Sequence, residues 1–125
     1  MKVEVSNGEI VDKMTILMIK SEKTLDTDKL ENITREIDCL SECVGLIGAP
    51  EELFNSLMHV NRLLWDVEDR LRECEADKRF DSVFIDLARS VYSLNDRRAR
   101  IKREINIVTN SMIIEEKVLP EYDIV

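Results

Sequence analysis

Two long runs of residues, apolar except for Arg98 and each spaced alternately by four and three positions, constrain the fold of this chain most strongly. The first run is Leu53, Leu57, Val60, Leu64, Val67, Leu71 and Cys74, and the second is Phe84, Leu87, Val91, Leu94, Arg98, Ile101, Ile105 and Val108. This spacing places every member of a run on one face of an α-helix. We therefore predict two helices, over about residues 50–76 and 81–108. Each would be about 40 Å long at about 1.5 Å per residue, and they would pack antiparallel across the turn at 77–81.

Two shorter helices are expected before this pair. Ser6 and Glu9 have the spacing of an N-terminal capping box and predict a helix over 7–24. That helix carries apolar residues on two sides, so we expect it to be buried on both. Asp26 can cap a second helix, which should end near residue 47, before Gly48.

These elements predict an all-α fold, an antiparallel bundle of four helices with two shorter and two long members. Three Gly and two Pro among 125 residues are too few for the many turns of a β-sandwich or barrel. We expect a short extended segment at 2–5, one helical domain over 1–119 and a loose tail over 120–125. The long pair would project beyond the short pair and leave an apolar seam uncovered, so we expect a homodimer.

Charge and cysteine content narrow the environment. The formal net charge of −8 disfavours binding to nucleic acid. No apolar run approaches the roughly 18 residues of a membrane span, and the N-terminus does not resemble a secretory signal. An odd number of cysteines suits a reducing cytoplasm. Cys39 and Cys43 are four positions apart and could bind zinc together with His59, but without a CxxC pair we expect half-buried apolar side chains instead.

Polar residues on the two long helices form the candidate site. The candidate ligand-binding residues are Asn61, Trp65, Asp66, Asp69, Glu73, Arg89, Tyr92, Asn95, Arg98 and Lys102. In one interpretation the acidic and basic faces form ion pairs that set the register of the helices. In a second, Asp66, Asp69 and Glu73 hold Mg²⁺ or Mn²⁺ while the basic stripe holds phosphate groups. In a third, the basic stripe is a surface for an acidic protein or RNA. We favour the ion pairs and expect no catalytic residue.

Arg98 occupies a core-type position between Leu94 and Ile101. A guanidinium keeps its charge, so inside a bundle it must meet an acid or an opening to water. Antiparallel packing about the turn places residue 98 opposite roughly 60–63. From that register we predict a bond from Arg98 to Asp66 or Asp69.

The chain also resembles a family of small uncharacterised proteins from bacteria and their phages, over nearly its whole length to about Lys117. The resemblance is carried by residues 3–17, 61–69, 88–92, 95–99 and 102–106. It implies a shared fold and no known activity. A much weaker similarity links residues 51–55 and 66–69 to the acidic EExxE and ExxD motifs of all-α nucleotide pyrophosphohydrolases, but the first segment lacks the third acid and the second has Asp for the first Glu.

From the sequence we expect a non-enzymatic interaction or scaffold module in the cytoplasm, paired with itself or with another protein. The alternative is a metal-dependent hydrolase of nucleotides or other phosphorylated small molecules, which alone would need Mg²⁺ or Mn²⁺ as cofactor.

Overall fold

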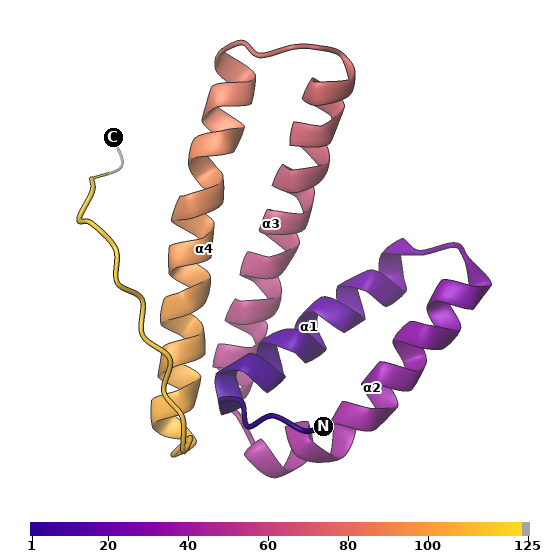
Figure 1. Cartoon of the computed structure of the whole chain (residues 1–125), viewed down its shortest axis with the longest axis vertical. Coiled ribbons are helices and arrows are strands. Elements are labelled where there is room, and N and C mark those ends of the chain that lie inside the picture. The colour runs from indigo at the N-terminus through magenta and orange to yellow at the C-terminus, as the bar shows by residue number, and fades with distance from the viewer. Residues whose placement is uncertain (124–125) are drawn as a thin grey trace.

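The computed structural model describes residues 1–123 and contains four helices with no strand in that range. The helices are α1 (Asn7–Lys23), α2 (Thr27–Ile47), α3 (Glu51–Ala76) and α4 (Ser82–Val108). They form two antiparallel hairpins, α1–α2 and α3–α4 (Figure 1). The predicted all-α bundle is confirmed, and each helix begins and ends within a residue or so of its expected bounds.

Local hydrogen bonds explain where the helices begin and end. Ser6 accepts a bond from the backbone N–H of Glu9, as the capping motif predicted. Asp26 and Asp81 cap α2 and α4 in the same way. Gly48 ends α2 in the left-handed region with φ 61°, where a glycine avoids the strain that a Cβ would bring.

Helix α1 is the centre of the packing. It lies against both α3 and α4 on one side, while α2 approaches α1 alone among the helices (Figure 1). Val11 of α1, Leu57 and Val60 of α3 and Ile105 of α4 form a core that is fully buried. Other apolar positions of α1, including Leu17, are also buried, so the expectation of a helix buried on two sides is confirmed.

The α3–α4 hairpin projects well beyond the α1–α2 hairpin (Figure 1). Its end, which we call the hairpin tip (residues 71–87), has exposed apolar side chains. Phe80 and Ile85 are each 53% exposed, and Val83 is 37% exposed. Phe80 packs edge-to-face on Phe84, with ring centroids 5.2 Å apart. These exposed side chains lie beside the predicted seam and not on it. The seam residues Cys74 and Leu87 are buried, because α3 and α4 cover them mutually, so the expectation of an uncovered seam was wrong, although the tip does expose apolar area.

Residues 111–123 form an extended C-terminal segment that runs back along α4 (Figure 1). Asn110, with φ 54°, turns the chain after α4. Of the predicted tail at 120–125, residues 120–123 belong to this segment and residues 124 and 125 lie outside the described part of the chain. The extended segment expected at 2–5 is neither helix nor strand.

Two of the three cysteines differ from expectation. Cys39 and Cys43 are exposed rather than half-buried, because α2 turns only one face toward α1 and has no other helix beside it. Cys74 is buried at the end of the α3 seam, and all three thiols are free.

Candidate functional site

A carboxylate at the junction of three helices organises the polar interior. Asp12 of α1 is 1% exposed. Its Oδ1 accepts hydrogen bonds of 2.9 Å from Arg98 Nε and from Asn61 Nδ2, and Arg98 Nη2 donates to its Oδ2. Helices α1, α3 and α4 therefore meet at one side chain, and the bond to Asp12 raises the pKa of Arg98 above its ordinary value.

A second ion pair and a hydroxyl complete this cluster. Lys102 Nζ lies 2.6 Å from Glu9 Oε2 and 3.9 Å from Asp12 Oδ2. Thr15 accepts a bond from Asn61 and donates one to the backbone carbonyl of Asp12. We call the six residues the polar cluster: Glu9, Asp12, Thr15, Asn61, Arg98 and Lys102. Two acids balance two bases in it, so each charge is matched within the cluster.

Hydrogen bonds join the N-terminus of α1 to the C-terminal end of α4, next to the polar cluster. The N–H groups of Asn7 and Gly8 donate to Ser111 Oγ at 2.9 Å and to Asn106 Oδ1 at 2.6 Å. These amides have no partner within their own helix. A Cβ built on Gly8 would lie 2.9 Å from Asn106 Oδ1 and 3.0 Å from the carbonyl carbon of Lys102. Only glycine allows the two backbones to approach this closely.

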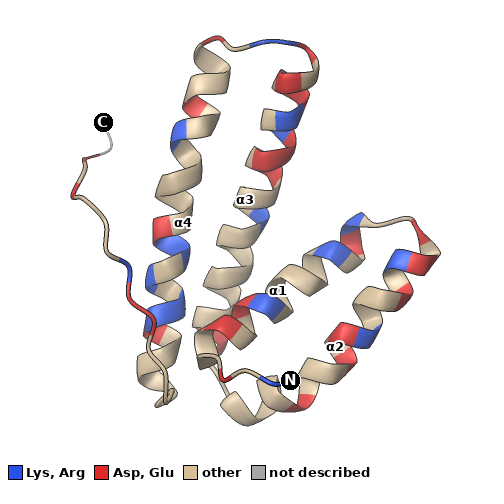
Figure 2. Cartoon of the chain, in the orientation of Figure 1, with Lys and Arg blue, Asp and Glu red and all other residues tan. Residues whose placement is uncertain are grey.

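Charged side chains hold the C-terminal segment against α4. Lys117 Nζ lies 2.9 Å from Asp96 Oδ1, and Tyr122 donates to Asp96 Oδ2. The bonds from Tyr122 and Lys117 lower the pKa of Asp96, and Asp96 in turn raises the pKa of Tyr122. Arg103 donates to both oxygens of Glu116, which lowers the pKa of that carboxyl group. Much of the positive charge on this part of α4 is therefore matched by α1 on one side and the C-terminal segment on the other (Figure 2).

A groove remains between α4 and the C-terminal segment. Its volume is about 580 Å³. Its lining comprises Val91, Tyr92, Asn95, Asp96, Arg98, Ala99 and Lys102 from α4 and Lys117, Leu119, Pro120 and Tyr122 from the C-terminal segment. We call this space the α4 groove.

The structure brings together five of the ten candidate residues predicted from the sequence. Tyr92, Asn95, Arg98 and Lys102 line the α4 groove, and Asn61 joins Arg98 and Lys102 in the polar cluster. The other five, Trp65, Asp66, Asp69, Glu73 and Arg89, belong to neither place.

The predicted partner of Arg98 was wrong. Arg98 binds Asp12 and not Asp66 or Asp69. The register was well estimated, because Asn61 and Arg98 share Oδ1 of Asp12. Asp12 belongs to α1, which lies against both long helices. The prediction considered the two long helices alone and so could not include it.

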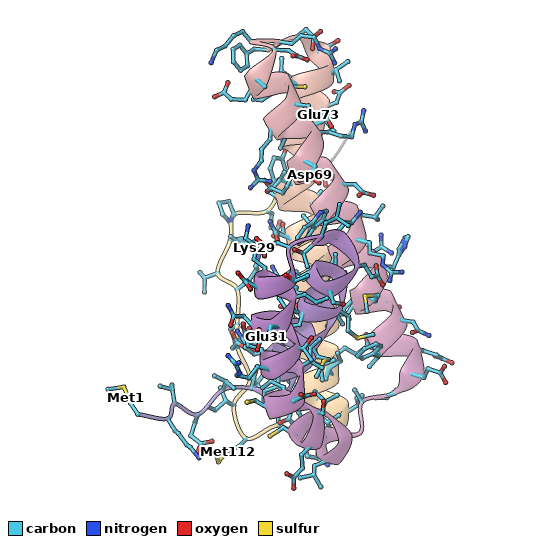
Figure 3. All side chains as sticks on the ribbon, turned by 90° about the vertical axis from the view of Figure 1, so that its right-hand side faces the viewer. Met1, Lys29, Glu31, Asp69, Glu73 and Met112 are labelled. Atoms are coloured by element: carbon cyan, nitrogen blue, oxygen red, sulfur yellow. The ribbon has the colours of Figure 1, made fainter. Side chains whose placement is uncertain are left out.

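The three carboxylates considered as a metal site are dispersed. Asp66 lies 3.9 Å from Lys23, and Asp69 lies 3.9 Å from Arg72. Asp69 and Glu73 are exposed on the distal part of the hairpin (Figure 3). Within residues 1–123, no three His, Cys, Asp or Glu side chains gather in a way that could hold a metal ion.

Sequence reasoning missed the α1 members of the polar cluster. Glu9, Asp12 and Thr15 recur every third position on a helix that is otherwise apolar on two sides. Polar residues in such a position are a signal for a buried partner. Asn106 lies one turn beyond Lys102 and continues the same stripe of α4.

A family model described as "Family of unknown function (DUF6165)" matches residues 1–122. The chain belongs to this family. The predicted resemblance to an uncharacterised family is thereby confirmed, and its family description includes no activity. Searches of curated proteins and of solved structures find no match. Across residues 1–123, no helix combines the length and apolar character that a membrane crossing requires.

Proposed function

We propose that this member of the family is a non-enzymatic interaction module of the cytoplasm that assembles through α3 and α4, with a second copy of itself as the partner. The observation that supports this most is the internal pairing of the polar cluster. Arg98 and Lys102, the cations best placed for chemistry, bind Asp12 and Glu9 of the same chain. These pairs hold the two hairpins in a fixed arrangement, and the surfaces that the hairpins present are then available for the interaction.

The hairpin tip is the surface we assign to the second copy. Phe80, Val83 and Ile85 expose apolar area on a two-helix projection that α1 and α2 do not reach (Figure 1). An antiparallel pair of such tips would bury these side chains against one another, outside the seam that joins α3 to α4. Closed two-fold dimers are the commonest way in which a chain covers a patch of this kind.

No observation on the described residues supports the hydrolase alternative. Its three carboxylates, Asp66, Asp69 and Glu73, are exposed. A hydrolase would need them to converge around a substrate.

Light scattering coupled to size exclusion tests the proposal. We expect about twice the chain mass of 14.5 kDa at micromolar concentration. Phe80→Asp and Ile85→Asp should each shift the protein toward monomer while its helical circular dichroism stays unchanged.

The matched control is Leu25→Asp. Leu25 is 99% exposed in the turn between α1 and α2, far from the tip, so this variant should remain dimeric. A monomeric wild type, or tip variants as dimeric as the control, would refute assembly through the tip.

A further inference from the structure

The α4 groove has the size of a ligand site, although it is open to solvent. Pockets for small molecules in proteins usually have volumes of about 300–1,000 Å³, and the volume of this groove is about 580 Å³. One wall is a regular helix. The other is the C-terminal segment, which is tied to that helix at Asp96 and Arg103. The wall positions are thus set by the fold and need no ligand to form.

The polar side of the groove has hydrogen-bond donors that the fold leaves unused. Arg98 has five N–H donors, and two of them bind Asp12. Lys102 has three, and Glu9 takes one at 2.6 Å. Arg98 and Lys102 line the groove, whereas Asp12 and Glu9 do not.

Asn95 offers the groove an amide that the fold does not use. It is half-buried on α4 between Tyr92 and Arg98, and its amide makes no hydrogen bond to any of residues 1–123. The charged residues lining the groove are three cations, Arg98, Lys102 and Lys117, and one acid, Asp96. Asp96 is already bound to Lys117 and to Tyr122. All three cations have an acid partner, so the preference comes from the N–H groups of Arg98 and Lys102 that remain unused, which suit the acceptor oxygens of a carboxylate or phosphate.

The remaining lining is apolar or aromatic. Val91, Ala99, Leu119 and Pro120 supply aliphatic surface, and Tyr92 packs edge-to-face on Tyr122 with ring centroids 5.3 Å apart. Such surface suits the apolar body of a ligand. It gives no reason to expect a second charged group on the ligand.

We propose that the α4 groove binds a small amphiphilic anion, with one carboxylate or phosphate head on Asn95, Arg98 and Lys102 and an apolar body between Tyr92 and Pro120. The head group adds charge-assisted hydrogen bonds to cations already held in place by α1. This inference concerns a different surface from the hairpin tip, and it holds whether or not the chain dimerises.

Titration followed by ¹H–¹⁵N NMR tests the inference with 3-phenylpropionate as the probe. Its neutral match, 3-phenylpropionamide, has the same body without the charge. We expect saturable shifts confined to residues 91–102 and 117–122, with the acid binding at least about tenfold more tightly than the amide, as charge-assisted bonds imply. Phenyl phosphate is titrated in the same way, and whichever of the two anions binds more tightly identifies the preferred head group.

Asn95→Leu removes an amide that makes no hydrogen bond to any of residues 1–123. It should weaken binding of the preferred anion at least about fivefold. Arg89→Leu is the matched control: it changes an exposed residue of the same helix outside the groove and should leave binding unchanged. Shifts outside the groove, equal binding of acid and amide, or equal affinity of the Asn95→Leu and control variants would each overturn the inference.

Discussion

Replacing Arg98 with methionine isolates the contribution of the polar cluster to stability. Methionine has a similar length and keeps the apolar contacts of the seam, but it leaves the Asp12 carboxylate 1% exposed without its guanidinium. Breaking a buried ion pair from one side costs about 3–5 kcal/mol. Arg98 is 28% exposed at its side chain, and Asn61 still binds Asp12, so we expect the lower part of that range.

Urea unfolding followed by circular dichroism measures this loss at one fixed protein concentration, because dimerisation would otherwise shift the midpoint. With a slope of about 1.5 kcal/mol per M, a loss of about 3 kcal/mol lowers the midpoint by about 2 M. Arg97→Met is the matched control. Arg97 is exposed and immediately precedes Arg98 in the same helix, so its replacement should change stability by less than about 0.5 kcal/mol.

A double variant decides the mechanism. The double variant Asp12→Leu, Arg98→Met leaves no buried charge without a partner. Replacing a buried ion pair with apolar side chains is often neutral for stability. We expect the double variant to regain more than half of the stability that Arg98→Met loses, even if the single variant is unfolded without urea. If Arg98→Met behaves like Arg97→Met, or if the double variant is no more stable than the single one, the reasoning about a stranded Asp12 is wrong.

Three further predictions concern other parts of the fold. Gly8→Ala should destabilise the protein by about 1–3 kcal/mol in the same urea assay, since a new methyl group has no space between α1 and α4; a neutral result would contradict the close approach. Because Asp96 raises the pKa of Tyr122, their contact is present below the ordinary tyrosine pKa of about 10 and is lost as pH rises through the raised value. Phenolate absorbance should therefore show Tyr122 ionising at lower pH in Asp96→Ala than in the wild type, and an unchanged titration would exclude the contact. Serine at both Cys39 and Cys43 should alter stability by less than about 0.5 kcal/mol and leave metal content unchanged, whereas zinc that disappears with these thiols would restore the metal interpretation.

The sequence alone determined the elements of this protein. Alternating four- and three-residue spacing defined α3 and α4, and the side chains of Ser6, Asp26 and Asp81 marked where three of the helices begin. These signals are local, because helical periodicity and capping depend on residues within a few positions of one another. The same reasoning singled out Arg98 as a charge in a core position and placed it opposite roughly 60–63, a range that includes Asn61.

Only the tertiary structure decided which acid Arg98 meets. Asp12 is 86 positions away, and its place depends on how α1 packs between two helices that it does not adjoin in sequence. The α4 groove has the same origin, since Tyr92, Asn95 and Lys102 become a lining only when residues 117–122 return along α4. Periodicity within a helix determines which face a side chain occupies, but the partner of that face is set by the packing of the whole chain.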